Sequence, residues 1–176
     1  EVKQSSAKDF EMLNKLGEGA FGVVWKVKRK EDGKEYAMKK VPQSLRFRLS
    51  WGHERKGTVE RINEIRILAS LNGEYIIGYK DAFYDESTST LNVIMEYASG
   101  GDILKRINDH IKKRTRFTED EIWKALVHMT KGTMQARVGL KSLHDCKILH
   151  RDLKCANVFI DAEGVYKLGD LNVSKV

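Results

Sequence analysis

The sequence predicts an α+β fold of two lobes: an antiparallel β lobe with one main helix, then an incomplete, mostly helical lobe. Short alternating apolar segments and a hairpin signal fill the first hundred residues, whereas helical periodicity prevails after them. Ser99-Gly100-Gly101 lies between the two regions and reads as a hinge. We therefore place a first domain at residues 8–98 and a second, partial domain at residues 99–176.

The first three predicted strands follow one another closely. Residues 10–16 lead into a glycine-rich turn, and residues 23–29 alternate loosely between apolar and polar. Asp32-Gly33 is a strong hairpin signal, because both residues tolerate the backbone angles of a tight turn. Residues 34–41 form the third predicted strand.

A helix and two further strands complete the predicted first lobe. Residues 58–71 carry apolar side chains at helical spacing, namely Val59, Ile62, Ile65 and Leu68. Strands are predicted at residues 76–84 and 90–97, on either side of a polar turn.

Helices dominate the second predicted lobe. Residues 102–111 fit a short helix, and Thr118-Glu119-Asp120-Glu121 has the form of a capping box that opens a long one. Residues 143–176 read as loops and short strands, including one that ends at Leu168.

Composition excludes several classes of protein. The chain is 41% hydrophobic, and its net charge is 32 − 25 = +7. The basic residues are scattered, which favours a solvated surface over affinity for acidic partners, although the second reading stays open. Cys146 and Cys155 form neither a disulfide framework nor a zinc pattern and suit a reducing compartment. No apolar run reaches the length of a membrane span, so we expect no membrane partner.

A glycine motif follows the first strand. Gly17, Gly19, Gly22 and Val24 fit the pattern G-x-G-x-x-G-x-V, and glycines let backbone amides approach phosphate oxygens. A plain glycine-rich hairpin turn is the alternative. A dinucleotide-binding turn would need a helix directly after the glycines, and a strand pattern follows instead. The motif therefore predicts a phosphate-binding flap between two antiparallel strands.

Two side chains of the third strand extend this site. Ala37 and Lys39 are two residues apart, so they face the same side of the strand. A small residue there leaves room for a flat base, and the ammonium group of Lys39 could reach its phosphates. Glu64, on the following helix, could hold the lysine by an ion pair. A solvated lysine and an exposed helical carboxylate are the alternatives.

The most specific signal is the string His150-Arg151-Asp152-Leu153-Lys154-Cys155-Ala156-Asn157, which matches the pattern H-R-D-L-x-x-x-N throughout. Asp152 could accept the proton of an attacking hydroxyl, and Lys154 could neutralise charge on a transferred phosphoryl group. Asn157 could bind magnesium. Asp170, thirteen residues later, could bridge magnesium to the β- and γ-phosphates.

With these motifs in this order, the chain resembles a eukaryotic protein kinase domain from Phe10 to Val176. Lys154 is typical of the serine/threonine branch. Within that branch the chain is most similar to the NIMA-related kinases, on the stretches NEIRILASLNGEYIIGYKDAFYD, VIMEYASGGDI, LHDCKILHRDLKCANVFI and KLGDLNVSKV.

The resemblance implies a protein-kinase-like bilobal fold with an ATP-binding first lobe and a catalytic second lobe. It implies ATP and Mg²⁺ as cofactors, and protein substrates that carry serine or threonine. Met95 would be the gatekeeper residue, Glu96 and Ala98 would belong to the hinge that binds adenine, and Asp102 would lie near the ribose. The implied nucleotide-binding set also contains Leu16, beside the glycine motif, and the implied metal ligands are Asn157 and Asp170.

Three features depart from the family pattern. Leu171 and Asn172 replace the phenylalanine and glycine of D-F-G, and asparagine is the non-glycine residue that best tolerates left-handed backbone. Residues 42–59 and 133–139 look like insertions. Seven residues are about two helical turns, so a continued helix would keep its apolar face in phase, whereas errors of gene prediction or splicing are the alternative. The activation segment is expected beyond Val176, so residues 1–176 alone are expected to be inactive and poorly soluble.

Three functions are compared. An active serine/threonine kinase is favoured over a nucleotide-binding pseudokinase or scaffold, because Lys39, Glu64, Asp152, Asn157 and Asp170 are all present. A basic nucleic-acid-binding module has no supporting motif, so no nucleic acid partner is expected. We expect a cytoplasmic location, and the family resemblance suggests association with the cytoskeleton or cilium.

Overall fold

A computed structural model describes residues 5–19, 22–42, 73–141 and 153–169. The chain divides into two compact units, one of residues 1–70 and 79–97 and the other of residues 71–78 and 98–176. The sequence placed the division at residue 98 and assigned residues 71–78 to the first domain. The structure differs there, because the backbone of residues 75–77 bonds to a strand of the second unit.

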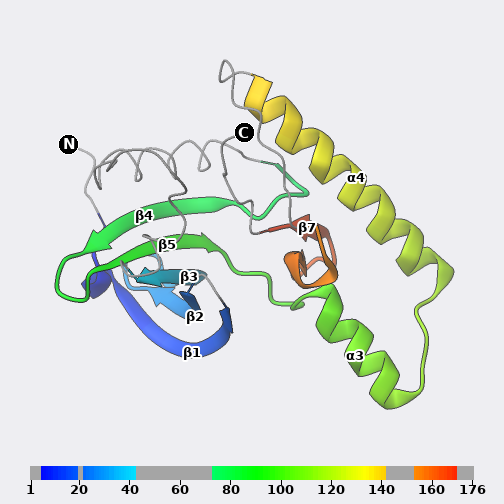
Figure 1. Cartoon of the computed structure of the whole chain (residues 1–176), viewed down its shortest axis with the longest axis horizontal. Helices are drawn as coiled ribbons and strands as arrows, with labels where there is room; N and C mark the ends of the chain where they lie inside the picture. The colour runs from blue at the N-terminus through cyan, green and yellow to red at the C-terminus, as the bar shows by residue number, and fades with distance from the viewer. Residues whose placement is uncertain (1–4, 20–21, 43–72, 142–152, 170–176) are drawn as a thin grey trace, which may run out of the picture. The chain divides into compact units, whose positions relative to one another are not determined.

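The first unit is a five-stranded antiparallel sheet (Figure 1). Its strands are β1 (Phe10–Gly19), β2 (Gly22–Arg29), β3 (Glu35–Pro42), β4 (Tyr79–Asp85) and β5 (Thr90–Glu96), in the spatial order β1-β2-β3-β5-β4. A single 3₁₀ turn, η1 (Ala7–Asp9), precedes β1. The strands predicted at residues 10–16, 23–29, 34–41 and 90–97 are confirmed, with ends that shift by one to three residues.

The predicted hairpin at Asp32-Gly33 joins β2 to β3. Gly33 has φ +65° and its N–H donates to the carbonyl oxygen of Arg29 over 2.9 Å. The carboxylate of Asp32 accepts the N–H of Lys34 over 2.9 Å and the hydroxyl of Tyr36 over 2.6 Å. The turn residues therefore satisfy both the backbone angle and the backbone donors that a tight hairpin leaves open.

One face of this sheet is covered by apolar side chains from all five strands. The cluster consists of Phe10, Val27, Tyr36, Met38, Phe83 and Ile94, with Trp25 packed against it. On β2 and β3, which contribute two residues each, these residues occupy alternate positions, as the two-residue period of a strand requires. The intervening residues therefore face the opposite side of the sheet.

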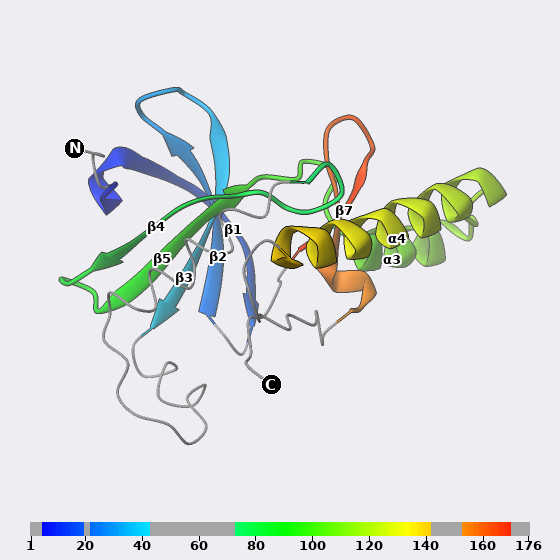
Figure 2. The same cartoon turned by 90° about the horizontal axis from the view of Figure 1, so that it is seen from above.

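The second unit is built around a two-stranded ribbon of β6 (Val158–Ile160) and β7 (Tyr166–Leu168), preceded by the 3₁₀ turn η2 (Cys155–Asn157). The helices α3 (Ile103–Lys113) and α4 (Glu119–Lys141) belong to the same unit (Figure 2). The four buried side chains of the ribbon, Val158, Ile160, Tyr166 and Leu168, pack against Ile103 of α3 and against Ala125 and Met129 of α4.

The predicted capping box opens α4. The hydroxyl of Thr118 accepts the N–H of Glu121 over 3.2 Å, and the Glu121 carboxylate accepts the N–H of Thr118 over 2.9 Å. The two residues thereby satisfy backbone donors that the first turn of a helix leaves without partners. α4 then continues to Lys141, so residues 133–139 are helical, as expected for an insertion that extends the helix.

The strand predicted from residue 76 begins only at Tyr79. Ile76 instead forms an isolated parallel bridge with Leu168. The N–H of Leu168 donates to Tyr75 over 2.9 Å, and the N–H of Ile77 donates to Leu168 over 2.8 Å. The backbone of the segment around Ile76 and Ile77 therefore bonds to β7, and the chain then continues into β4 of the five-stranded sheet.

The helix predicted at residues 58–71 and the loop at residues 143–152 lie outside the described residues. Among the helices that the structure describes, none combines the length and the apolar character needed to cross a membrane.

Candidate active site

Four predicted nucleotide-binding residues share one face of the sheet. Val24 is the register partner of Lys39, and Ala37 is the partner of Met95. Directly opposed residues point to the same side of a sheet, as do residues two apart on one strand. Val24, Ala37, Lys39 and Met95 therefore all lie on the face opposite the apolar cluster, where a planar base and its phosphates could be accommodated together.

Lys26 adds a second cation to this face, since it pairs with Ala37. Its Nζ lies 2.8 Å from Oε1 of Glu35 and 4.7 Å from the centre of the Tyr97 ring. The hydrogen bond to Glu35 raises the pKa of Lys26 above its ordinary value. Lys26 is therefore held as a charged side chain.

The glycine motif bridges β1 and β2. Gly17 pairs with Val24 and Gly19 pairs with Gly22, so the motif is a hairpin flap between antiparallel strands, as predicted. A Cβ at Gly17 or Gly19 would meet no atom within 4 Å. Leu16, the other predicted contact in this region, is 44% exposed. These residues are thus open to a ligand.

Gly22 differs from the two preceding glycines of the motif. It has φ +125°, and a Cβ there would lie 2.1 Å from the carbonyl oxygen of Lys40. A side chain at this position is excluded by the fold itself, whether or not a phosphate is bound.

The predicted hinge residues fall on both sides of the division between the units. Glu96 is the last residue of β5 and pairs with Tyr36. Ala98 belongs to the second unit, where its carbonyl oxygen accepts the N–H of Gly101 over 3.3 Å.

Asp102 has a structural role that the sequence analysis did not assign to it. It is the N-cap of α3, and its Oδ1 accepts the N–H of Lys105 over 2.8 Å. A carboxylate at this position satisfies an open donor of the helix and interacts favourably with the helix dipole. The predicted ribose contact would have to share this carboxylate with the cap.

The described part of the catalytic loop leads directly into the ribbon. The side chain of Lys154 is exposed, and its carbonyl oxygen accepts the N–H of Asn157 over 2.9 Å. Asn157 is buried at the end of η2, directly before β6, and its own carbonyl oxygen accepts the N–H of Gly169 over 2.9 Å. Gly169 immediately precedes Asp170 in the sequence, and its hydrogen bond to Asn157 is the described contact nearest to the two predicted metal-binding positions.

Other predicted site residues lie outside the described residues, namely Glu64, Asp152 and Asp170. The ion pair between Lys39 and Glu64 therefore stays a prediction. Within the described ranges, no group of three histidine, cysteine or acidic side chains could hold a metal ion. That finding does not test the predicted metal ligands Asn157 and Asp170, because Asp170 lies outside the described residues.

A contact that sequence reasoning missed supports the same strand. The backbone of Tyr75 and Ile77 bonds to Leu168, on the edge of β7 that β6 does not occupy. These bonds join main-chain atoms, which are the same for every residue type, so the amino-acid sequence carries no direct signal for them.

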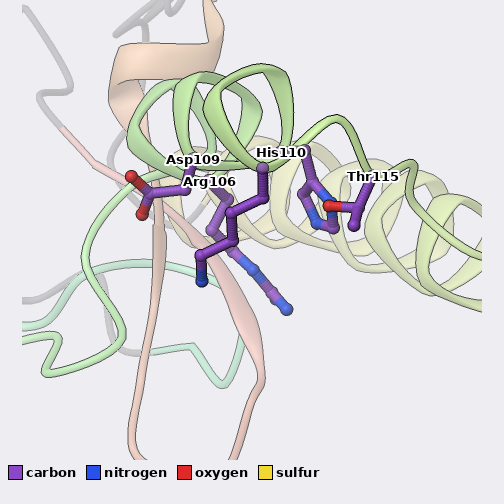
Figure 3. Close-up of a pocket in the computed structure, with 5 residues that line it drawn as sticks. Arg106, Asp109, His110 and Thr115 are labelled. Atoms are coloured by element: carbon purple, nitrogen blue, oxygen red, sulfur yellow. The ribbon is translucent and has the colours of Figure 1, made fainter.

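A shallow hollow lies at the C-terminal end of α3, with a volume of about 300 Å³ (Figure 3). It is lined by Arg106, Asp109, His110, Lys113 and Thr115, and Figure 3 shows His110 and Thr115 pointing toward one another. Nδ1 of His110 lies 2.8 Å from the Thr115 hydroxyl. None of the predicted nucleotide or metal residues lines this hollow, so we do not assign it to the active site.

Comparison with known proteins places the chain in a family. It matches the protein kinase domain over residues 10–176. It is 36% identical to the probable serine/threonine-protein kinase nek2 of Dictyostelium discoideum over 170 residues. That alignment covers 95% of this chain and 37% of the Dictyostelium protein. It is 38% identical to serine/threonine-protein kinase Nek1 of Mus musculus, over 93% of this chain and 12% of that protein. It is 31% identical to serine/threonine-protein kinase Nek2 of Homo sapiens, over 98% of this chain and 37% of that protein.

The chain thus spans between 12% and 37% of the length of these three relatives. The resemblance to the NIMA-related kinases drawn from the motifs is confirmed by these matches. From the glycine flap of its sheet to the Asn157–Gly169 ribbon, the chain belongs to the protein kinase domain family.

Proposed function

We propose that the protein transfers the γ-phosphoryl group of ATP to serine or threonine hydroxyls of proteins. The observation that carries this proposal is the hydrogen bond between Gly169 and Asn157. It joins the residue before Asp170 to Asn157, the last residue of the H-R-D-L-x-x-x-N motif, and in protein kinases this asparagine and this aspartate hold the magnesium ions.

Each remaining group is assigned the role that its motif implies. Lys39, beside Ala37 and Val24, binds phosphate oxygens, and the exposed Lys154 neutralises charge on the phosphoryl group in flight. Asp152 orients the attacking hydroxyl and accepts its proton. Because this reaction depends mainly on positioning and charge stabilisation, the hydrogen-bonded ribbon that follows Asn157 matters as much as the groups themselves.

Magnesium is the cofactor that the family implies. An asparagine and an aspartate supply the oxygen ligands that Mg²⁺ prefers, so these two residue types fit the ion. Asn157 and Asp170 would hold it, and when bound it neutralises charge on the phosphates.

Nucleotide binding is tested in the full-length protein by calorimetry with MgATP. Lys39→Ala should weaken binding by roughly tenfold or more, because it removes a charged phosphate ligand. Lys40→Ala is the matched control, since Lys40 pairs with Val23 and Asn92 and therefore points to the other face of the sheet. Equal losses in the two variants would contradict the assignment of Lys39.

Catalysis is tested by phosphate transfer from labelled ATP to casein. Asp152→Asn should reduce the rate by at least about a hundredfold, the usual contribution of a positioned base. Asp109→Asn, on α3, is the control and should retain activity. MgATP binding without any transfer that depends on Asp152 would instead support a pseudokinase or scaffold.

We also propose a cytoplasmic location, supported by the free, exposed thiol of Cys155, which suits a reducing compartment. Imaging of the tagged full-length protein tests this, and an extracellular or lumenal signal would overturn it.

A further inference from the structure

His128 lies on the face of α4 that packs against β7. Its ring is 4.8 Å from the ring of Tyr75 and 5.9 Å from the ring of Tyr166, measured between ring centres. The N–H of Tyr166 donates to Nδ1 of His128 over 3.1 Å. One imidazole thus contacts both the segment around residue 75 and the strand β7.

This hydrogen bond completes an otherwise open edge of the strand. The N–H groups of residues two apart on a strand point to the same edge, so those of Tyr166 and Leu168 do so. The Leu168 N–H is taken by the carbonyl oxygen of Tyr75. The bridge between Tyr75 and Leu168 does not extend to Tyr166. The N–H of Tyr166 therefore bonds to Nδ1 of His128 instead of to a backbone carbonyl oxygen. Tyr166 is only 3% exposed, so leaving its N–H without an acceptor would be costly.

The bond also determines the protonation state of the ring. A backbone N–H can only donate, so Nδ1 must carry a lone pair and the neutral ring keeps its proton on Nε2. A protonated imidazole would carry hydrogen on both nitrogens and could not accept this bond. Protonation of His128 therefore removes one of the anchors of β7.

The charged groups around the ring come from every element packed against it. Lys124 and Lys131 of α4 disfavour a proton on His128, whereas Glu74 and Asp161 favour one. Tyr75 and Tyr166 are the two titratable aromatic neighbours. Burial, followed by the two lysines, lowers the pKa of His128 below its ordinary value, so the neutral form prevails near neutral pH.

We propose that His128 is a positioning residue for phosphoryl transfer: its neutral imidazole fixes β7, the strand that precedes Gly169 and Asp170 in the sequence, and its protonation releases that strand. The role in transfer rests on the proposed function, whereas the anchoring of β7 does not. Lowering the pH would therefore reduce the order of β7 by a route independent of the catalytic carboxylates.

Two variants test the hydrogen-bond acceptor and the aromatic ring of His128 separately. His128→Asn retains an acceptor at the position of Nδ1 and does not titrate. His128→Phe retains an aromatic ring but has no acceptor. His110→Asn is the matched control, because the His110 ring lies on α3 and contacts Phe117 and Thr115 instead of β7.

The first readout is hydrogen exchange of the peptide spanning residues 165–169 in the full-length protein, corrected for intrinsic exchange. At about pH 7.5, His128→Phe should exchange roughly tenfold faster than wild type, and His128→Asn should stay within about twofold. As the pH is lowered stepwise below about 6.5, the ordinary histidine value, exchange in wild type and in His110→Asn should rise toward that of His128→Phe once the lowered pKa of His128 is passed, while His128→Asn should not change.

The second readout is phosphate transfer to casein. His128→Phe should lower kcat with little change in the KM for casein, and His128→Asn should restore kcat and remove part of the loss at acid pH. If no variant transfers phosphate, the proposed function fails while the exchange data still decide the anchoring. An acid response of His128→Asn equal to that of wild type, or full protection of β7 in His128→Phe, would overturn the proposal.

Discussion

Gly132 of α4 packs directly on the backbone of Tyr75: a Cβ at Gly132 would lie 2.5 Å from the Tyr75 carbonyl oxygen and 3.1 Å from Cδ1 of Leu168. That carbonyl oxygen accepts the N–H of Leu168. The glycine therefore lets the helix approach the bridge that supports β7, one turn beyond His128.

Gly132→Ala should destabilise the protein, although alanine is favoured over glycine inside a helix by about 1 kcal/mol. The overlap with a hydrogen-bonded carbonyl cannot be relieved by a side-chain rotation, so we expect a net loss of about 1–3 kcal/mol in the free energy of unfolding. Urea unfolding measures it. Thr133→Ala, at an exposed position of the same turn, is the control and should change stability by less than about 0.5 kcal/mol. A Gly132→Ala variant more stable than wild type would show that α4 does not approach Tyr75 so closely.

Alanine substitutions of two flap glycines should affect different properties: Gly22→Ala should lower stability, and Gly19→Ala should lower nucleotide affinity. Gly22→Ala would place a Cβ 2.1 Å from the Lys40 carbonyl oxygen at φ +125°, so it should cost at least about 2 kcal/mol of stability. Gly19→Ala meets no atom, so it should leave stability within about 0.5 kcal/mol of wild type. Its added Cβ would nevertheless hinder the approach of backbone amides to phosphate, and MgATP affinity should fall roughly tenfold.

Thermal unfolding and calorimetry on the same two samples test this contrast. A Gly19→Ala variant with unchanged affinity would indicate that phosphates do not lie under this part of the flap.

The capping box of α4 should make stability depend on pH. The N–H of Thr118 is the main cause that lowers the pKa of Glu121 below its ordinary value, and Arg106, 2.9 Å from Oε1, contributes as well. A carboxylate whose pKa is lowered by folding stabilises the protein above the unfolded-state pKa. That contribution is lost as the pH falls through the lowered folded-state value.

Glu121→Gln should therefore be less stable than wild type at neutral pH, by about 0.5–1 kcal/mol. The difference should shrink once the pH falls below the unfolded-state value of about 4.3 and should vanish below the lowered folded-state pKa of Glu121, where wild type loses the same charge. Asp120→Asn, in the same turn but outside the capping box, should show a smaller difference. Urea unfolding as a function of pH provides the measurement, and a gap between wild type and Glu121→Gln that persists at acid pH would contradict the assignment.

Local features of the fold were predictable because their causes are local. The turn at Asp32-Gly33 and the capping box at Thr118 depend on side chains within four residues of one another, and both formed as expected. The shared face of Val24, Ala37 and Lys39 follows from the two-residue period of strands once the hairpin is known.

Features that depend on distant contacts were not predictable in this way. Ile76 looked like the start of a strand, yet it pairs with Leu168, ninety-two positions away, through backbone atoms alone. His128 is one histidine within a helix, and only the fold reveals that Tyr166 needs its acceptor. The N-cap role of Asp102 was not predicted either, because a carboxylate suits both a helix N-cap and a ribose contact and the sequence does not distinguish the two.

The outward side of α4 provides the last prediction. Ala125, His128, Met129 and Gly132 face the ribbon, yet large apolar side chains also lie on the exposed side of the helix, among them Trp123, Val127 and Met134, which are 57%, 44% and 62% exposed. These three residues share one stripe, since their spacing of four and seven corresponds to whole helical turns.

A helix that is apolar on both sides is normally covered on both sides, so we expect residues 1–176 alone to self-associate through this stripe. The double variant Val127→Gln and Met134→Gln should shift the chain toward monomer in sedimentation velocity, because it removes apolar area from the stripe without touching the face on β7. Ile111→Gln is the matched control: Ile111 is 67% exposed but lies on α3, so its replacement should leave association unchanged. A wild-type chain that sediments as a monomer, or an Ile111→Gln variant that dissociates as readily as the double variant, would show that the α4 stripe is not the surface involved.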